Sequence, residues 1–247
     1  PKDSSSSSSG GGGGGGGGGS SYRPSQPVIT PTEPNEPIET PPVVETPETP
    51  EIPPVVEEPN QQFTLNTSKP YIQGYLDGSF QPQNNITRAE VATIISRIVD
   101  GYSDEIDYTN NFGDVNTTDW YENYVSFASE KGIINGSYGN YRPTENITRA
   151  EFSAIIYRLL KEESVATSIF PDVQNTFFEK EIAVLTNKGI ISGYLDGTFK
   201  PNAPITRAEA VKMINTAFNI PNKNINTTFW DVPADFWAYN YINNACN

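Results

Sequence analysis

The sequence predicts a mainly helical protein made of three helix-loop-helix repeats. Three short patterns support this prediction, and each occurs three times along residues 63–247. The first is Ile-Thr-Arg-Ala-Glu at 86–90, 147–151 and 205–209. The second is Phe-x-Asp-Val with an aromatic residue eight positions after the phenylalanine, and the third is a glycine-containing turn closed by a proline. Patterns that recur at such even spacing are typical of repeat proteins, whose units bury their apolar faces against one another.

Each copy of Ile-Thr-Arg-Ala-Glu predicts the start of a helix. The threonine suits the N-cap, where its hydroxyl accepts a backbone N–H, and the glutamate at N3 can accept the N–H of the cap. Apolar residues then follow at helical spacing in every copy. We therefore expect three capping boxes, formed by Thr87 and Glu90, Thr148 and Glu151, and Thr206 and Glu209.

Phe-x-Asp-Val precedes a shorter predicted helix in each repeat. The motif stands at 112–115, 170–173 and 229–232, and the aromatic residues eight positions on are Trp120, Phe178 and Trp237. Apolar residues at helical spacing come next. Two of these helices are expected to end at a basic residue followed by a C-cap glycine, Lys131-Gly132 and Lys188-Gly189.

A tight turn is expected between the two helices of a repeat. Gly74-Tyr-Leu-Asp-Gly-Ser-Phe80 and Gly193-Tyr-Leu-Asp-Gly-Thr-Phe199 contain Asp-Gly, which is a strong turn signal. The middle copy at 136–141 is one residue shorter and has no aspartate. We therefore expect the middle turn to differ from the other two.

The repeats are offset by half a unit relative to the two ends of the chain. Proline-rich sequence occupies the place where the first repeat would have its Phe-x-Asp-Val half, and the last such half has no following capping box. We expect residues 229–247 to complete the first repeat and close the domain. The predicted boundaries are 63–109, 110–167 and 168–222 for the three repeats and 223–247 for the C-terminal half-repeat.

Residues 1–62 are expected to form a linker without a folded core. The serine and glycine runs at 1–21 predict disorder, because they cannot bury enough apolar surface to fold. The segment 22–62 is rich in proline, threonine and glutamate, which favour an extended spacer. Because the chain begins at Pro1 without a signal peptide, we expect a fragment of a longer protein.

The composition argues against several classes of function. The net charge is −14 and there is no basic tract, so nucleic acid is not an expected partner. No apolar run approaches the roughly 20 residues of a membrane span, so membrane insertion is not expected. The chain has no histidine, the commonest general base and metal ligand, and we expect no catalytic residue, metal site or cofactor. Cys246 is the single cysteine, so it cannot form an internal disulfide, and we expect no role for it.

The arginine inside each capping box is not explained by the helix itself. Arg88, Arg149 and Arg207 are expected at N1, where the positive end of the helix dipole disfavours a cation. Three arginines at the same position predict a use for the charge. One use is an anion bound between the guanidinium group and the helix N-terminus. The other is pairing with neighbouring carboxylates of this acidic protein.

Together, the three patterns resemble the S-layer homology domain, a bacterial surface-anchoring module. The resemblance covers about 63–247, which is all of the chain expected to fold. It implies three repeats packed as a pseudo-threefold trimer of modules around a central helix bundle. It also implies an extracellular location at the cell wall or S-layer, with non-covalent binding of secondary cell wall polysaccharide attached to peptidoglycan. In this family the polysaccharide often contains pyruvylated N-acetylmannosamine, and it is held in grooves between neighbouring repeats.

The resemblance also implies a set of ligand-binding residues. Arginines would hold the ketal carboxylate, aromatic rings would face the sugar, aspartates would bind its hydroxyl groups, and glycines of the turn would line the groove. These expected residues are Arg88, Arg149, Arg207, Trp120, Trp237, Tyr75, Tyr194, Asp114, Asp172, Asp231, Gly74, Gly136 and Gly193. Alternatively, the aromatic residues are core residues and the aspartates cap helices.

The middle repeat departs from the family pattern. Phe178 stands where a tryptophan is expected, and Ser137 stands where the other repeats have Tyr75 and Tyr194. We therefore expect three unequal grooves, of which one or two bind tightly.

Three other functions are compatible with an extracellular repeat protein: anchoring of an attached enzyme, catalysis by this chain, and calcium-dependent docking. Residues 63–247 could be the anchoring region of a larger surface-bound glycoside hydrolase or other extracellular enzyme, whose catalytic domain lies outside this chain. Such a passenger domain could also contact neighbours in an S-layer lattice. Catalysis by this chain would need a unique pair of carboxylates, and none stands out among the repeated acids. A calcium-dependent docking loop would need alternating acidic ligands, whereas Tyr75–Phe80 supplies one acid.

Overall fold

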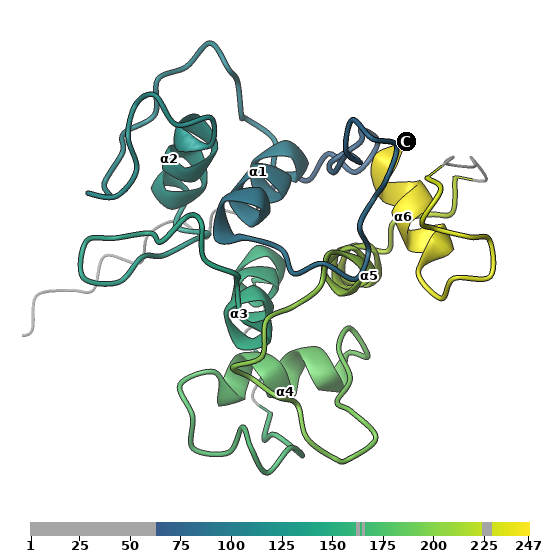
Figure 1. The fold of residues 1–247 in the computed structure, drawn as a ribbon. Coiled ribbons are helices and arrows are strands. Elements are labelled where there is room, and N and C mark those ends of the chain that lie inside the picture. Colours follow the sequence, from purple (N-terminus) through teal and green to yellow (C-terminus); the bar gives the residue numbers. More distant parts are fainter. Residues whose placement is uncertain (1–62, 162–163, 165, 224–228) are drawn as a thin grey trace, which may run out of the picture. The chain divides into compact units, whose positions relative to one another are not determined.

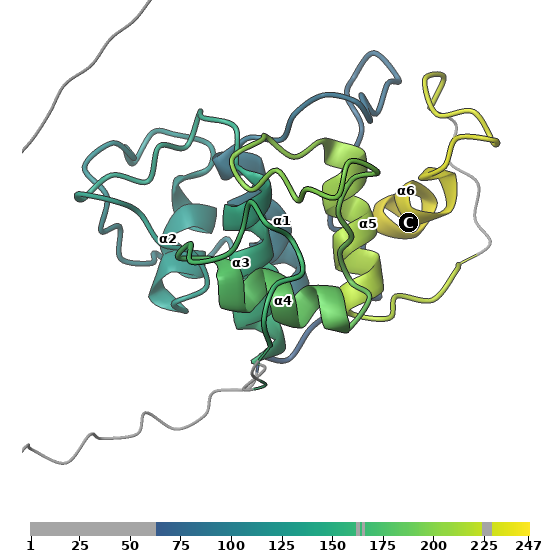
Figure 2. The ribbon, with the colours of Figure 1, turned by 90° about the horizontal axis from the view of Figure 1, so that it is seen from below.

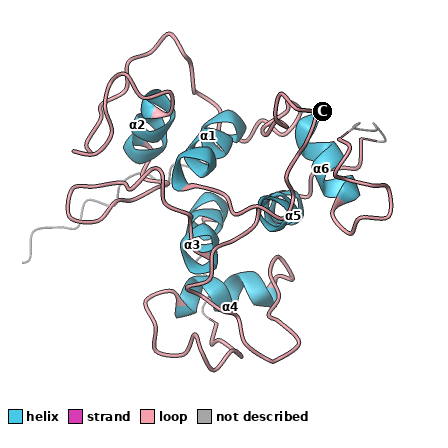
Figure 3. Ribbon diagram, in the orientation of Figure 1, coloured by secondary structure: helices cyan, strands magenta, loops and turns pink. Residues whose placement is uncertain are grey.

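The computed structural model describes residues 63–161, 164, 166–223 and 229–247, all within the unit Val56–Asn247. The predicted linker segments 1–21 and 22–62 lie outside these residues. The described part contains isolated β-bridges and no strand, so the predicted mainly helical class is confirmed (Figure 3). Its helices are α1 (Arg88–Ile98), α2 (Glu122–Glu130), α3 (Arg149–Leu160), α4 (Glu179–Asn187), α5 (Arg207–Ala217) and α6 (Tyr239–Cys246) (Figure 1).

The longer helices α1, α3 and α5 begin at the predicted capping boxes. In α1 the hydroxyl of Thr87 accepts the N–H of Glu90 at 3.3 Å, and the Glu90 carboxylate accepts the N–H of Thr87 at 2.8 Å. The same reciprocal pair is present at the starts of α3 and α5. Two of the N–H groups that a helix start leaves unpaired are therefore satisfied locally in each case.

The shorter helices α2, α4 and α6 follow the Phe-x-Asp-Val motifs. None of them has a side-chain hydrogen bond at its N-cap. The first two end as predicted, because Gly132 and Gly189 follow the last turn with φ values of 66° and 69°. These left-handed conformations suit glycine and close the helix. No helix in the described part is both long and apolar enough to cross a membrane.

The six helices pack in pairs. Helix α1 packs on α2, α3 on α4 and α5 on α6, and α3 also contacts α5. In Figures 1 and 2 the longer helices lie toward the middle of the described part and the shorter helices lie outside them. The apolar stripe predicted for each longer helix is buried, as at Val91, Ile156 and Ile214. Burial of these stripes is the main source of stability for helices this short.

The starts of the three longer helices are joined by a closed ring of backbone hydrogen bonds. Ile86 donates to the carbonyl of Ile205 at 3.1 Å, Ile205 donates to Ile147 at 3.2 Å, and Ile147 donates to Ile86 at 3.1 Å. All three isoleucines are fully buried. Each repeat is therefore bonded to both of the others at one buried point.

The C-terminal segment packs on the first turn of the domain. The ring of Phe229 lies 5.5 Å from that of Phe80, and the carboxylate of Asp231 accepts the backbone N–H groups of Phe80 and Gln81 at 2.8 and 2.7 Å. Tyr71 donates its N–H to the carbonyl of Ala245 at 3.0 Å. Equivalent contacts within the other repeats join residues that are much closer in sequence. The two ends of the described part are thus packed together.

Candidate functional site

The three arginines of the capping boxes are buried, with 3 to 6% of their surface exposed. Each extends from the first turn of its helix to a different repeat. The Nε group of Arg88 donates to the carbonyl of Tyr141 at 2.7 Å, and its Nη2 group donates to the carbonyl of Asn135 at 3.0 Å. Its Nη1 group pairs with Glu151 at 2.7 Å. The alternative that these arginines pair with internal carboxylates is therefore confirmed for Arg88.

The other two arginines make the same contacts in rotation. Arg149 pairs with Glu209 at 3.1 Å, and Arg207 pairs with Glu90 at 3.0 Å. Each glutamate thus serves two helices, since Oε2 caps its own helix and Oε1 binds an arginine of another repeat. Three of the five N–H groups of each guanidinium donate in these contacts, which leaves two for another acceptor.

Aromatic rings cover the guanidinium groups. The Cζ atom of Arg88 lies 4.7 Å from the centre of the Tyr141 ring, and Arg149 lies 4.7 Å from Phe199. Two further rings predicted as site residues, Tyr75 and Tyr194, lie 4.8 and 4.9 Å from Arg207 and Arg149. Such cation–π contacts stabilise a buried guanidinium group.

A pocket lies beside each of the three arginines, and we name the pockets after them. Their volumes are 270 Å³ for the Arg149 pocket, 360 Å³ for the Arg88 pocket and 150 Å³ for the Arg207 pocket. All three are built from the same parts: the arginine, the residues before the turn, one face of the next longer helix, and aromatic residues after the next Phe-x-Asp-Val motif. The predicted residues Trp237, Phe178 and Trp120 line the Arg149, Arg88 and Arg207 pockets in that order.

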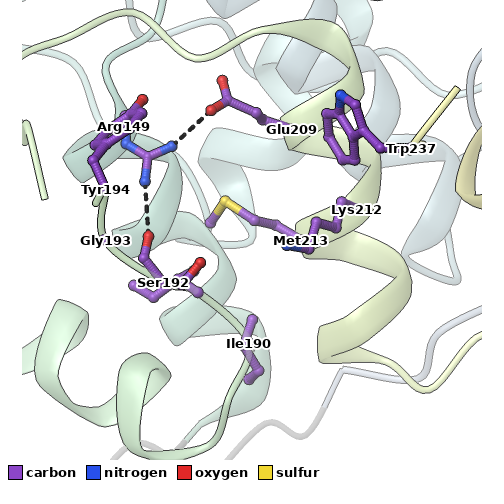
Figure 4. Close-up of a pocket in the computed structure, with 10 residues that line it drawn as sticks. Arg149, Ile190, Ser192, Gly193, Tyr194, Glu209, Lys212, Met213 and Trp237 are labelled. Atoms are coloured by element: carbon purple, nitrogen blue, oxygen red, sulfur yellow. Dashed lines mark hydrogen bonds and ion pairs between the residues drawn. The ribbon is translucent and has the colours of Figure 1, made fainter.

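Figure 4 shows the Arg149 pocket. Arg149 and Tyr194 lie on one side, where Arg149 bonds to Glu209 and to the carbonyl of Ser192, and Trp237 lies on the other side. The Trp237 side chain is 50% exposed. In the Arg207 pocket Trp120 is 63% exposed and Tyr75 is 40% exposed. The alternative that these aromatic residues are core residues is wrong for the two tryptophans, which present open ring surface beside a cation.

Each pocket also contains cations that sequence reasoning missed. They are Lys212 in the Arg149 pocket, Arg97 in the Arg207 pocket, and Arg142 and Arg158 in the Arg88 pocket. Arg97 and Arg158 lie seven residues after the capping-box glutamate, and Lys212 lies three residues after it. Helical geometry places these positions on one face, so the spacing could have revealed them. Since each capping-box arginine is matched by a glutamate, these residues leave each pocket with excess positive charge.

The aspartates of Phe-x-Asp-Val do not line any of these three pockets. Both oxygens of Asp114 accept backbone N–H groups, from Tyr141 and Arg142, each at 2.7 Å. Asp172 and Asp231 bind the corresponding N–H groups of the other two turns. They therefore hold the turn beneath the pocket. The alternative that they cap helices is also wrong, because α2, α4 and α6 have no side-chain N-cap bond.

The glycines that open the turns are required by close packing. A Cβ atom at Gly136 would lie 2.5 Å from the Phe112 ring and 2.4 Å from the carbonyl of Asn140. Gly74 and Gly193 face Phe229 and Phe170 in the same way. Gly136 and Gly193 line their pockets, whereas Gly74 is not among the lining residues of the Arg207 pocket.

The aspartates of the turns are bonded within the turn. The carboxylate of Asp196 accepts the N–H and the hydroxyl of Thr198, and these bonds lower its pKa to about 2. Asp77 bonds to Ser79 in the same way, and its pKa is also lowered. Among the described residues, no group of three or more acidic or cysteine side chains is arranged to hold a metal ion. Burial raises the pKa of the Cys246 thiol to about 12.

The Arg88 pocket differs from the other two at the positions where the middle repeat departs from the family pattern. Ser137 replaces the tyrosine, and Phe178 with its exposed neighbour Phe177 replaces the tryptophan. Arg142 lies at the edge of this pocket and pairs with Glu145 and Glu151, each at 3.2 Å. The pocket is therefore richer in cations and poorer in indole and phenol surface.

Comparison with known proteins gives consistent relatives. The chain is 35% identical to a cellulosome-anchoring protein of Acetivibrio thermocellus over 184 residues, which is 70% of this chain and 41% of that protein. It is 34% identical to cell surface glycoprotein 1 of the same organism over 70% of this chain and 8% of that protein. It is 33% identical to exoglucanase XynX of Acetivibrio thermocellus over 60% of this chain and 14% of that protein. The chain therefore spans less than half the length of these relatives.

The model of one protein family matches the chain in three separate segments. The segments are 64–92, 111–153 and 169–211, and the family is described as the S-layer homology domain. They contain the capping boxes, two of the Phe-x-Asp-Val motifs and the turns described above. The expected resemblance is thus confirmed, and this chain belongs to the S-layer homology domain family.

Proposed function

We propose that residues 63–247 anchor a surface protein non-covalently to the bacterial cell wall by binding secondary cell wall polysaccharide. The family and the names of the relatives, a cellulosome-anchoring protein and a cell surface glycoprotein, support this function. The protein is then extracellular and lies at the cell wall or S-layer surface. The module itself is not an enzyme; it holds other domains in place.

The observation that carries the proposal is one pocket built three times at equivalent places in the repeats. Each pocket combines excess positive charge with aromatic surface, although the net charge of the whole chain is −14. A sugar bearing a carboxylate, such as pyruvylated N-acetylmannosamine, matches this combination. The carboxylate would bind the additional cation and the remaining guanidinium N–H groups, and the sugar ring would lie on the exposed indole.

The proposed ligand contacts keep part of the predicted set and add to it. Arg88, Arg149 and Arg207 present a guanidinium edge while holding the repeats together. Sugar-facing surface comes from Trp120, Trp237, Tyr75 and Tyr194, and the added cations are Arg97, Arg142, Arg158 and Lys212. The predicted aspartates act indirectly, by shaping the turn that the ligand rests on. The glycines shape the same turn, and Gly136 and Gly193 also line their pockets.

We further propose that the repeats pack as a pseudo-threefold trimer of modules around a central helix bundle. The modules keep the boundaries 63–109, 110–167 and 168–222, and 229–247 completes the first of them. The closed ring of isoleucine hydrogen bonds and the rotating arginine–glutamate pairs support this arrangement. Three weak sites on one domain gain affinity together, because binding at one raises the effective concentration of glycan at the others.

A second candidate is that this chain anchors a larger extracellular enzyme. The similarity to exoglucanase XynX, of which the chain matches 14%, favours this candidate. In that case the catalytic domain, and any contacts with lattice neighbours, belong to parts of the protein beyond this chain. Both candidates share the same wall-binding step, so one experiment tests that step for both.

The test is co-sedimentation of the purified protein with isolated bacterial cell walls. We expect Lys212→Ala and Trp237→Ala to weaken binding about tenfold, since each removes a direct contact worth about 1.4 kcal/mol. Trp230→Ala is the matched control, because Trp230 is a 72% exposed tryptophan seven residues before Trp237 that does not line these pockets. The capping-box arginines are less suitable targets, since replacing them also breaks contacts between repeats.

Three wall preparations separate the ligand from the rest of the wall. Native walls should bind the protein, walls stripped of secondary polysaccharide should not, and walls from which pyruvate has been removed should bind it weakly. Equal binding to native and stripped walls would rule out the polysaccharide as the ligand. Equal binding to native and depyruvylated walls would rule out the carboxylate contact alone.

A further inference from the structure

The Arg207 pocket is the smallest of the three, but a second hollow adjoins it. The second hollow has a volume of 360 Å³ and shares Gln73 and Arg97 with the Arg207 pocket. The Arg207 pocket alone, at 150 Å³, is smaller than the roughly 300 Å³ of a typical ligand site. The hollow is also lined by Asn66, Lys69, Asp100, Tyr102, Asp104 and Tyr124.

The lining of this hollow is mostly polar and has balanced charge. Lys69 and Arg97, which also lines the Arg207 pocket, supply two cations, and Asp100 and Asp104 supply two carboxylates. Amide groups of Asn66 and Gln73 add donors and acceptors. A neutral ligand with many hydroxyl groups suits such a surface, whereas the excess positive charge of the Arg207 pocket suits an anionic ligand.

The wall of the hollow is held in place by packing of aromatic residues. The Tyr102 ring stacks on Tyr124 at 4.7 Å and meets the edge of Phe127 at 5.4 Å. The Tyr108 hydroxyl donates to the carbonyl of Gly101 at 3.0 Å and accepts the N–H of Ser103 at 3.1 Å. These bonds fix the backbone of the segment 99–111, which follows α1. A site whose walls are ordered before binding loses less entropy when a ligand arrives.

The N-terminal part of the hollow is also tied to the domain. Asn66 donates its N–H to the carbonyl of Ile98 at 2.7 Å, and Asp100 donates its N–H to the carbonyl of Thr64 at 2.9 Å. These bonds hold the segment before the first turn against the end of α1. The hollow therefore combines two segments that meet only at the first repeat.

The sequence indicates that this hollow has no equivalent in the other repeats. The linker 99–111 carries Tyr102 and Tyr108, whereas the linkers 161–169 and 218–228 are shorter and contain no tyrosine. The segment 63–70 likewise precedes only the first repeat. The hollow thus extends one pocket and leaves the other two as single sites.

We propose that the hollow is a second sugar subsite, which binds a neutral hexose or N-acetylhexosamine joined to the acidic sugar in the Arg207 pocket. This inference rests on the proposed function and specifies its ligand further. The groove at Arg207 and Trp120 recognises two successive residues of the polysaccharide, one anionic and one neutral. The pockets at Arg149 and Arg88 recognise the anionic residue alone.

Titration followed by nuclear magnetic resonance can test this, because the chain has three tryptophans in distinct places. The indole N–H signal of Trp120 reports on the extended groove, and that of Trp237 reports on the Arg149 pocket. The signal of Trp230, which lines neither pocket and donates to the carbonyl of Asp77, shows whether the first turn itself moves. The probes are the methyl glycoside of pyruvylated N-acetylmannosamine and a disaccharide in which this residue is joined to a neutral N-acetylhexosamine. The disaccharide should bind about tenfold more tightly than the monosaccharide at Trp120, and with equal affinity at Trp237.

A double variant, Lys69→Ala with Asp100→Ala, removes one cation and one acid at the surface of the hollow. The ratio of the two affinities at Trp120 should then fall toward one. The double variant Asp107→Ala with Lys131→Ala makes the same change of charge outside the pockets, and it should keep the tenfold ratio. A ratio near one in the unaltered protein, or a tenfold ratio that survives Lys69→Ala with Asp100→Ala, would overturn the subsite. If neither sugar shifts Trp120 or Trp237, the proposed function itself fails, and the subsite fails with it.

Discussion

The arginine at the first position of α1, α3 and α5 acts between repeats. A cation at this position is disfavoured by the helix dipole by a few tenths of a kcal/mol. Arg88 more than offsets this effect, because its guanidinium group donates to two carbonyl groups and one carboxylate of another repeat. With 5% of its surface exposed, its charge would be costly without these acceptors. The residue therefore positions the pocket and stabilises the domain by the same contacts.

Replacing Arg88 should consequently destabilise the fold. Arg88→Ala removes the shorter ion pair of Glu151 and leaves the carbonyl groups of Tyr141 and Asn135 without this donor, and we expect a loss of about 3–5 kcal/mol in the free energy of unfolding. Arg142→Ala is the control, because Arg142 pairs with the same Glu151 but its side chain is 41% exposed. Its loss should be below about 1 kcal/mol. Urea unfolding of both variants measures the difference, and equal losses would contradict this account.

At the scale of the element, each turn is shaped by the aromatic ring that packs on it. Phe112 lies so close to Gly136 that no side chain fits between them. The carboxylate of Asp114 then accepts the backbone N–H of Tyr141, at the end of the turn. The turn carries the carbonyl group that binds the arginine, so this packing decides where the pocket forms. The Phe-x-Asp-Val motif thus positions the turn beneath the pocket, although its phenylalanine and aspartate do not line the pocket.

Gly136→Ala tests this packing. The added Cβ atom would lie within 2.5 Å of both the Phe112 ring and a carbonyl oxygen, so we expect destabilisation of about 1–3 kcal/mol. Gly113→Ala is the matched control, since a Cβ atom there would meet its nearest neighbour at 3.6 Å. Thermal melts of the two variants compare them directly. An unchanged melting temperature for Gly136→Ala would mean that the turn can shift away from the ring.

The helices of this fold could be predicted from sequence because their signals are local. A capping box such as Thr87 with Glu90 and the apolar stripe after it lie within one helix, and both predictions are confirmed. The pockets could be predicted only in part. The partners of Arg207 lie at Gln73, Phe80 and Glu90, more than a hundred positions away, and no local pattern encodes such a contact.

The role of the Phe-x-Asp-Val aspartates shows the same limit. An aspartate just before a helix is most simply a cap or an exposed ligand, and both interpretations place its carboxylate at the surface. In the structure, Asp172 binds N–H groups of a turn that lies 27 residues further along the chain. Only the folded repeat brings these groups together.

For the whole molecule, the central fact is that the contacts between repeats close on themselves. The ring of backbone hydrogen bonds that joins Ile86, Ile147 and Ile205 has no free end. In addition, Asp231 binds the first turn as Asp114 binds the second. Loss of any member therefore leaves buried polar groups in the other repeats without partners. The domain should accordingly unfold as one unit.

Removing residues 229–247 tests this closure. The deletion exposes Phe80, leaves α5 without α6, and removes the two carboxylate oxygens of Asp231 that accept N–H groups of the first turn. We therefore expect the whole domain to melt on the order of 10 °C lower. Differential scanning calorimetry measures the change. As a milder pair, Phe229→Ala should lower the melting temperature more than Trp230→Ala, since Trp230 is 72% exposed and its indole contributes one hydrogen bond of 3.3 Å to the carbonyl of Asp77. An unaltered transition after the deletion would show that the ends of the domain are independent.

The rotating arginine–glutamate pairs make each copy of the motif necessary to the other two. Loss of the copy at 147–151, for example, would leave Arg88 without Glu151 and Glu209 without Arg149, so that two different repeats would each keep an unmatched charge. A change in this motif of one repeat is therefore felt in both of the others.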